Sequence, residues 1–311
     1  MGKIAFLFSG QGAQFVGMGK ELYDNIKESR EVFEDADNAL GFSISKMCFE
    51  GPDEQLNSTE NTQPAILTTS IAALKALEAN GIVADITAGL SLGEYSALVY
   101  SGSLSFSDAV KLVKKRGKYM QEAVPQGVGT MAAILGLDEE LVREACNQCL
   151  NIGIVEPANL NCPGQIVIAG EVRAVEAACE KCTEKGAVRT VMLTVSGPFH
   201  TSMLKPAAER LEEELKSVNI KQSNIPVVTN VTGEVVENTE DIKPYLKRQV
   251  MSSVLFEKSI RTMIDMGVDT FVEIGPGKAL SGFIKKINRK ALILNVQDLK
   301  SLKTTIEKLK K

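Results

Sequence analysis

Several features are absent from this sequence of 311 residues. No stretch approaches the run of about 18 apolar residues that a membrane-spanning helix needs. The first residues, MGKIAFLFSGQGAQ, reach glycine and glutamine too early for the apolar core of a signal peptide. The net charge is only −4 and the lysines are scattered, so no basic surface indicates nucleic-acid binding. These absences predict a cytoplasmic protein that binds neither membranes nor nucleic acids.

The composition is that of an ordinary globular protein, with 44% hydrophobic and 24% charged residues. A chain of this length can bury a substantial core without metals or disulfides. It exceeds the usual size of a single-core domain, so we expect two domains, or one large domain with an insertion.

Six cysteines are present, and four of them form two C-x-x-C pairs, at 146–149 and 179–182. Such pairs can be the two halves of a zinc site. Both pairs fall in predicted helices, at about 138–150 and 171–185, which we expect to pack antiparallel with the pairs near opposite ends. Small buried thiols are the simpler interpretation, and we expect no metal.

Strands and helices alternate along the chain, which predicts an α/β fold with a mainly parallel sheet. The predicted strands of the larger part lie at 4–8, 86–89, 227–230 and 270–274. A helical stretch is expected after the first strand as far as about Leu40, with further helices at 64–79, 94–100, 108–121 and 301–311.

The middle of the chain has a different pattern. Strands are predicted at 130–137, 154–160, 165–169 and 188–195, and the two helices that carry the cysteines lie between them. This βαββαβ order is typical of a ferredoxin-like unit. We therefore expect residues 128–196 to form a small inserted domain, with residues 1–127 and 197–311 forming the large one. Gly127 and the Ser-Gly-Pro at 196–198 are the expected connections, and a cleft between the domains would suit a substrate.

The sequence G-L-S-L-G at residues 89–93 matches the G-x-S-x-G motif of a nucleophile elbow. A predicted strand precedes it and a predicted helix follows it, as the elbow requires. That helix would direct its N-terminal amides toward charge developing at Ser91. The alternative is a tight turn in which Ser91 only caps the helix.

The chain contains a single histidine, His200. A nucleophilic serine commonly needs a base with a pKa near neutrality. His200 follows a predicted strand and precedes a helix, as Ser91 does, so both side chains could face one end of a sheet. A lone histidine can also be a surface or core residue, but together with Ser91 it indicates a base.

Arg116 lies on the apolar stripe of the helix predicted at 108–121, among Ala109, Leu112, Val113 and Met120. An inward guanidinium needs an anionic partner, because burying it unpaired is costly. The partner could be a protein carboxylate, or a substrate carboxylate held by a two-pronged hydrogen bond.

Two glycine-rich stretches fail as nucleotide motifs. The G-Q-G at residues 10–12 has Phe15 where a dinucleotide fingerprint needs its third glycine. The G-P-G-K at residues 275–278 is followed by Ala279, where a phosphate loop needs serine or threonine. Dehydrogenase and kinase functions are therefore not expected.

Taken together, the motifs resemble the malonyl-CoA:acyl-carrier-protein transacylase family and the acyltransferase domains of polyketide synthases. The resemblance runs nearly end to end and rests on these segments: FSGQGAQ at 8–14, GLSLGEYSAL at 89–98, Arg116, NCPGQ at 161–165, GPFH at 197–200, NVTG at 230–233, Gln249 and EIGPG at 273–277. It implies an α/β-hydrolase-like domain with a ferredoxin-like insertion.

The resemblance also implies the roles of individual residues. Ser91 would be the nucleophile, His200 its base, and the main-chain amides of Gln11 and Leu92 the oxyanion hole. Arg116 would bind the malonyl carboxylate.

The main-chain carbonyl of Gln249 would orient the imidazole in place of an acid, and the ring of Phe199 would select malonyl over branched acyl groups. Many members have histidine where this chain has Leu90. A contact between that histidine and the substrate is therefore not expected here.

The activity implied is ping-pong transfer of malonyl from malonyl-CoA to the phosphopantetheine of acyl carrier protein, in fatty-acid synthesis. We expect a monomer that needs no cofactor or metal. Two other functions stay open. A thioesterase-like hydrolase would use the same serine and histidine, whereas a non-catalytic carrier-protein-binding module would need neither.

Overall fold

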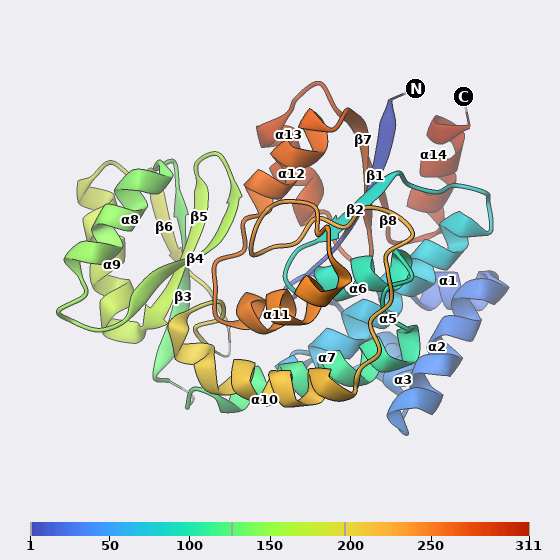
Figure 1. The fold of residues 1–311 in the computed structure, drawn as a ribbon, viewed down its shortest axis with the longest axis horizontal. Coiled ribbons are helices and arrows are strands. Elements are labelled where there is room, and N and C mark those ends of the chain that lie inside the picture. Colours follow the sequence, from blue (N-terminus) through green and yellow to red (C-terminus); the bar gives the residue numbers. More distant parts are fainter. Residues whose placement is uncertain (1, 126, 196, 311) are drawn as a thin grey trace.

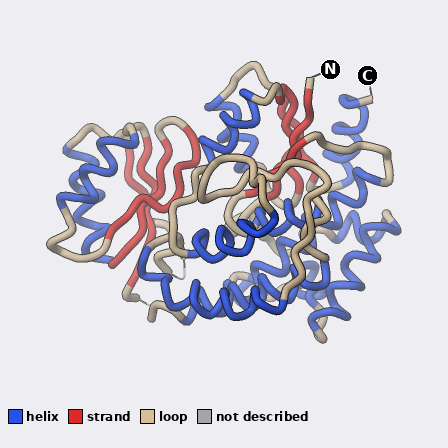
Figure 2. The backbone as a smooth tube through the Cα atoms, in the orientation of Figure 1, coloured by secondary structure: helices blue, strands red, loops and turns tan. Residues whose placement is uncertain are grey.

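The computed structural model describes residues 2–125, 127–195 and 197–310. Two lobes lie side by side in Figure 1, and each contains a four-stranded sheet. In Figure 2 the two sheets form separate groups of strands. The prediction of a mixed α/β fold with a parallel sheet is confirmed. In the part of the chain described, no helix has the length and apolar character needed to span a bilayer.

The sheet of the large lobe has the strand order β2-β1-β7-β8, and its neighbouring strands pair in parallel. The strands are β1 (Lys3–Phe8), β2 (Ile86–Gly89), β7 (Val268–Ile274) and β8 (Leu292–Val296). Because parallel strands share a direction, their carboxyl ends meet at one edge of the sheet. The loop after β1 and the turn after β2 therefore lie next to each other, which is what assembles the site.

Helices cover both faces of this sheet. Phe6 and Phe8 of β1 face one hydrophobic cluster, while Ala5 and Leu7 face another, as the alternation of side chains along a strand requires. The helices of the large lobe are α1 (Lys20–Asn25), α2 (Lys27–Leu40), α3 (Ile44–Glu50), α4 (Asp53–Leu56), α5 (Thr59–Glu78), α6 (Gly93–Tyr100), α7 (Phe106–Glu122), the 3-10 helix η1 (Ser202–Leu204), α10 (Lys205–Ser217), α11 (Thr239–Val250), α12 (Phe256–Asp265), α13 (Ala279–Ile287) and α14 (Leu299–Leu309).

The sheet of the small lobe is antiparallel, with the order β4-β5-β3-β6. Its elements follow the predicted order along the chain: β3 (Gly129–Leu135), α8 (Glu139–Gln148), β4 (Val155–Cys162), β5 (Gln165–Glu171), α9 (Val172–Glu184) and β6 (Arg189–Met192).

The two faces of the small sheet have different partners. Ala132, Ile134 and Ile166 lie in a cluster with residues of α8 and α9. Met131 and Val167, which point to the opposite face, belong to the main core of the large lobe. Because side chains alternate along a strand, one face of this sheet packs in the core of the small lobe and the other face packs against the large lobe.

The strand predicted at residues 227–230 is wrong. Only isolated bridges form there, from Val227 to Thr87 and from Val228 to Val235. The preceding Pro226 has no amide hydrogen to extend the pairing, and the chain turns away after Val228. This segment nevertheless brings Asn230 to the edge of the sheet, beside the turn after β2.

Other boundaries also differ. The helical stretch expected after the first strand does not begin until Lys20, and Ile26, with an extended backbone, divides it into α1 and α2. The strand predicted at 188–195 is shorter, and β8 was not predicted. Ser196, the expected end of the small domain, lies outside the described residues.

The cysteine pairs do not lie at opposite ends of the small lobe. Cys146, Cys149, Cys179 and Cys182 are all buried in one cluster. Burial, reinforced by the nearby Cys182 and Cys149 thiols, raises the pKa of Cys146 to about 12. Because α8 is only 10 residues long, the two helices offer little room to separate the pairs. All four are free thiols.

Candidate active site

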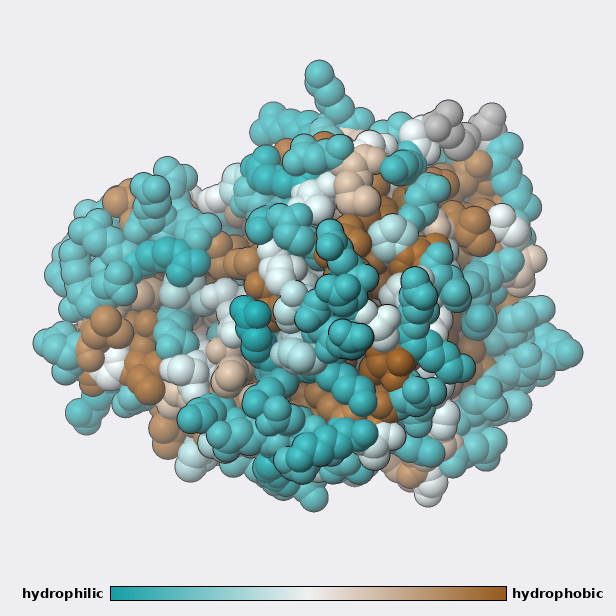
Figure 3. All heavy atoms as spheres, in the orientation of Figure 1, coloured by the Kyte–Doolittle hydropathy of each residue, from teal (hydrophilic) through white to brown (hydrophobic). Residues whose placement is uncertain are grey.

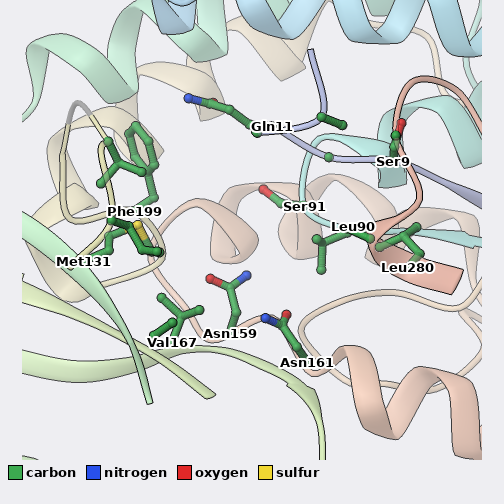
Figure 4. Close-up of a pocket in the computed structure, with 18 of the residues that line it drawn as sticks. Ser9, Gln11, Leu90, Ser91, Met131, Asn159, Asn161, Val167, Phe199 and Leu280 are labelled. Atoms are coloured by element: carbon green, nitrogen blue, oxygen red, sulfur yellow. The ribbon is translucent and has the colours of Figure 1, made fainter. Parts of the chain in front are cut away.

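A cavity of about 810 Å³ opens between the two lobes. The large lobe contributes Ser91 and Gln11 to its lining, and the small lobe contributes Met131, Asn159 and Asn161. In Figure 4 the two asparagines extend from the small lobe toward Ser91. The face of the molecule drawn in Figure 3 is mainly hydrophilic, with hydrophobic residues visible between the lobes.

Ser91 occupies the sharp turn between β2 and α6. Its φ of 52° lies in the left-handed region, which a residue with a side chain adopts only at a cost. Glycine is needed on both sides of it. A Cβ on Gly89 would overlap the main chain of Gly93, and one on Gly93 would overlap the main chain of Phe8. The turn therefore packs tightly against β1 and leaves the serine hydroxyl facing the cavity.

His200 contacts Ser91 directly. Its Nε2 lies 2.7 Å from Ser91 Oγ, and its Nδ1 lies 2.7 Å from the main-chain oxygen of Gln249. Like the serine, His200 has a positive φ, of 64°. Donation from Nδ1 to the Gln249 carbonyl leaves Nε2 as the acceptor for the serine proton. The two residues, 109 positions apart, are thus joined at the sheet edge.

The surroundings of His200 favour its neutral form. The ring is buried, with 4% of its surface exposed. This burial, together with the positive charge of Arg116, lowers the pKa of His200 to about 4, although the Gln249 carbonyl acts in the opposite direction. At neutral pH the imidazole is therefore free to accept a proton.

Arg116, on α7, reaches the same hydroxyl from the other side. Its Nη2 donates to Ser91 Oγ at 3.1 Å and to Gln249 Oε1 at 2.9 Å. Its Nη1 donates to Gln63 Oε1 at 2.8 Å, and its Nε has no hydrogen-bond partner among the described residues. The guanidinium lies 5.4 Å from the ring of Tyr95 and is 1% exposed.

No carboxylate of the described residues forms an ion pair with Arg116. Its partners are two amide oxygens and a hydroxyl, all neutral. Burial accordingly lowers the pKa of Arg116. A buried cation without a protein anion among the described residues, next to the Ser91 hydroxyl, is suited to binding an anionic group of a ligand.

Gln11, in the loop after β1, lines the same cavity as Ser91, and Leu92 follows Ser91 directly at the start of α6. Within the described chain, the main-chain N–H of neither residue donates to a protein acceptor. The side chain of Gln11 is held separately, by a 3.2 Å hydrogen bond from Nε2 to Thr59 Oγ1. Main-chain amides without a protein acceptor can stabilise a negatively charged oxygen that develops in this cavity.

Asn230 has a structural role that the sequence did not reveal. Its Oδ1 accepts the amide hydrogen of Ser91 at 2.6 Å, and its Nδ2 donates to the carbonyl of Gly89 at 2.7 Å. The asparagine thus clamps the turn on both sides of the serine. The motif that contains it was visible in the sequence, but 139 residues separate the two partners.

Glu94 is the second residue whose role was missed. It lies on α6, is 1% exposed, and its Oε2 accepts hydrogen bonds from the Asn230 amide and from Gln249 Nε2, both at 2.8 Å. Burial raises its pKa to about 7. Its position three residues after Ser91 on a helix gave no sign that it faces inward.

Phe199 and Leu90 both line the cavity. Figure 4 shows the Phe199 ring next to Met131, on the side of the cavity away from Leu90. Both residues are apolar, so the space around the serine combines a hydrophobic wall with a single buried cation. In the part of the chain described, no group of three or more His, Cys, Asp or Glu side chains is arranged to hold a metal ion.

The described geometry defines what the site can do. A hydroxyl with a base at 2.7 Å can attack a carbonyl, free amides can stabilise the resulting oxyanion, and a cation at 3.1 Å can hold a carboxylate of the same substrate. This combination suits transfer of a short acyl group that carries a second, charged end.

Comparison with known proteins agrees with this chemistry. The family described as "Acyl transferase domain" matches residues 5–305. The fold and the site thus define an acyltransferase.

Individual relatives identify the family more closely. The malonyl CoA-acyl carrier protein transacylase of Bacillus subtilis (strain 168) is 51% identical over 311 residues, covering 100% of this chain and 98% of that protein. This chain belongs to the malonyl CoA-acyl carrier protein transacylase family.

Solved structures show the same likeness. The crystal structure of the transacylase from Clostridium perfringens superposes with a TM-score of 0.97 at 55% identity, covering 99% of this chain and 97% of that one. A malonyl-transacylase solved in complex with its type II PKS acyl-carrier protein has a TM-score of 0.96 at 40% identity, covering 98% and 99%.

Proposed function

We propose that this protein transfers a malonyl group from malonyl-CoA to the phosphopantetheine thiol of an acyl carrier protein, through an ester on Ser91, in fatty-acid biosynthesis. One observation carries the proposal: Ser91 Oγ contacts His200 Nε2 and Arg116 Nη2 at the same time. The names of the relatives, which include both malonyl CoA and the carrier protein, support the choice of substrates.

In the first half-reaction, His200 Nε2 accepts the Ser91 proton as Oγ attacks the thioester carbon of malonyl-CoA. The amides of Gln11 and Leu92 stabilise the tetrahedral oxyanion. The carbon–sulfur bond then breaks, and the leaving sulfur of coenzyme A takes the proton from His200. The product is a malonyl ester on Ser91.

The second half-reaction reverses these steps. The carrier-protein thiol gives its proton to His200 Nε2 and attacks the ester carbon, and the proton returns to Ser91 as the ester bond breaks. Thioester and oxygen ester are close enough in energy for exchange in both directions. Throughout, the Gln249 carbonyl holds the imidazole in place at 2.7 Å.

Arg116 selects for the malonyl group by binding its free carboxylate with two N–H groups. The same pairing holds the acyl chain away from bulk water and so slows hydrolysis. Phe199, beside the cavity, leaves little room for the extra methyl of a branched acyl group.

The chemistry needs only the substrates and these side chains, so we propose that no metal or cofactor takes part. The partners are malonyl-CoA and acyl carrier protein, and the enzyme acts in the cytoplasm as a monomer. The large lobe (1–127 and 197–311) is assigned as α/β-hydrolase-like and the small lobe (128–196) as a ferredoxin-like insertion. The strand order β4-β5-β3-β6 supports the latter.

Incubation of the protein with radiolabelled malonyl-CoA, with and without holo acyl carrier protein, tests the proposal. We expect label on the protein alone and its movement to the carrier protein when that is added. Free malonate as the only product would instead indicate a hydrolase. Absence of label from the protein would indicate a binding module and would refute the proposal.

A further inference from the structure

Glu94 is a buried carboxylate close to the reacting atoms that takes no part in the mechanism above. Its side chain is 1% exposed, and within the described chain it forms no ion pair. One oxygen, Oε2, accepts both hydrogen bonds, from the Asn230 amide and from Gln249 Nε2. A carboxylate is costly to bury, so these two donors must account for its position.

The Gln249 side chain connects Glu94 to Arg116. Its Nε2 carries two hydrogens, one directed at Glu94 Oε2 at 2.8 Å and the other at the Ser91 carbonyl at 2.9 Å. Its Oε1 accepts from Arg116 Nη2 at 2.9 Å. Every strong hydrogen-bonding group of the amide is therefore used, in one orientation.

The opposite orientation of this amide is unfavourable. It would set the amide oxygen against the Glu94 carboxylate and the amide N–H groups against the guanidinium, which has donors only. The carboxylate, together with the Ser91 carbonyl, thus fixes which end of Gln249 faces Arg116. A neutral amide oxygen positions the guanidinium without neutralising it.

The Gln249 side chain keeps Glu94 from pairing directly with Arg116. Were Glu94 bound directly to Arg116, the guanidinium would already be paired with an anion. One amide separates the two charges, so Arg116 keeps its Nη2 at 3.1 Å from Ser91 Oγ, and its Nε has no hydrogen-bond partner in the described part of the chain. Their attraction through the amide still helps to keep both groups charged in the interior.

We propose that Glu94 is a positioning residue for acyl selection: with the Ser91 carbonyl it fixes the orientation of the Gln249 amide, and this amide holds Arg116 at Ser91 as a cation without a protein anion, ready for the substrate carboxylate. The inference rests on the proposed function, since it assigns the carboxylate to malonyl. It adds a residue that contributes to the choice of acyl group although it lies on α6 and not in the wall of the cavity.

Two substitutions separate hydrogen bonding from charge. Glu94→Gln removes the charge, but its amide oxygen can take the place of Oε2 and accept from both donors. Glu94→Leu removes the acceptor as well and leaves Gln249 Nε2 with only the Ser91 carbonyl as a strong partner. Glu273→Gln is the matched control, because Glu273 is equally buried but binds the start of α13, through Leu280 and Ser281.

For each variant, kcat and KM are measured with malonyl-CoA and with acetyl-CoA, which lacks the carboxylate. In Glu94→Leu we expect kcat/KM for malonyl to fall about tenfold relative to acetyl, mainly through KM. Glu94→Gln should restore the ratio to within about threefold of the wild-type value. Glu273→Gln should change both substrates by the same factor.

Equal losses for both acyl groups in Glu94→Leu would reduce Glu94 to a structural residue and overturn the proposal. So would a Glu94→Gln variant as unselective as the leucine variant. Should thermal melting show that Glu94→Leu does not fold, Glu94→Gln decides alone, and a tenfold change in its ratio overturns the proposal. Failure of the proposed function would be seen separately, as wild-type protein that malonyl-CoA does not label.

Discussion

Arg116 Nη2 lies 3.1 Å from Ser91 Oγ, so the buried cation touches the hydroxyl that His200 also contacts. A guanidinium this close to the nucleophile can reach only a short acyl group. In a malonyl ester on Ser91, the free carboxylate is two carbon–carbon bonds from the ester carbon. In the proposed mechanism, specificity and nucleophilic attack are therefore set by the same few atoms.

Arg116→Ala should separate malonyl from acetyl transfer. Loss of a two-pronged, charge-assisted contact is expected to lower kcat/KM for malonyl-CoA about 100-fold. For acetyl-CoA, which has no carboxylate to bind, the loss should stay within about fivefold. Steady-state transfer to holo acyl carrier protein measures both.

Arg116→Lys serves as the matched variant, because it keeps the charge but not the planar fork. It should recover only part of the malonyl activity. Equal losses for malonyl and acetyl in Arg116→Ala would remove the case for a carboxylate clamp.

Ser91→Ala should abolish covalent labelling by malonyl-CoA, lowering transfer roughly 10⁴-fold or more, because among the described residues no other hydroxyl is hydrogen-bonded to the imidazole. Binding of malonyl-CoA, measured by calorimetry, should remain, since Arg116 and the cavity are unchanged. Label that persists on the alanine variant would place the nucleophile elsewhere.

The labelling rate should fall only at a pH well below the usual pKa of histidine; this fall is the acid limb of the pH profile. Burial and Arg116 hold the pKa of His200 at about 4, and the base must be unprotonated to act. Single-turnover labelling is therefore expected to stay level from about pH 8 to about pH 5. A limb near pH 6.5, the usual pKa of histidine, would contradict this environment.

Removal of the Arg116 charge provides a second test of the pKa of His200. In Arg116→Ala the positive charge that lowers the pKa of His200 is gone, so the limb should move to higher pH. Acetyl-CoA is the substrate of choice here, because its transfer does not depend on the clamp. A limb that stays in place would mean that burial alone sets the pKa.

How much of the site the sequence predicts depends on how local each signal is. Ser91 was found from its five-residue motif, His200 from being the only histidine, and Arg116 from its place on an apolar stripe. Each of these signals is confined to one segment. The fold class followed in the same way, from the alternation of strands and helices.

Residues that act across long separations gave no such signal. Asn230 and Ser91 are 139 positions apart, and the strand predicted around Asn230 does not form. Glu94 and Gln249 are 155 apart. Their importance comes from buried hydrogen bonds between segments, which neither periodicity nor composition reveals. A charged residue on a short helix is expected to face solvent until packing shows otherwise.

Asn230→Ala tests the clamp on the elbow. The substitution removes the acceptor of the Ser91 amide and the donor to the Gly89 carbonyl, and it leaves both groups buried without a partner. We expect a loss of about 2–4 kcal/mol in the free energy of unfolding, measured by urea denaturation. Because Ser91 is held at a positive φ, labelling should also slow as the turn relaxes.

Asn230→Asp and Asn238→Ala complete this test. The aspartate keeps the acceptor for the Ser91 amide, but its carboxylate cannot donate to the Gly89 carbonyl. Asn230→Asp should therefore lose at least half as much stability as Asn230→Ala. Asn238 is exposed at the N-cap of α11, where its side chain donates to Asp241, and its substitution should cost about 0.5–1 kcal/mol. If Asn230→Ala cost no more than Asn238→Ala, the turn would be held by the packing of Gly89 and Gly93 alone.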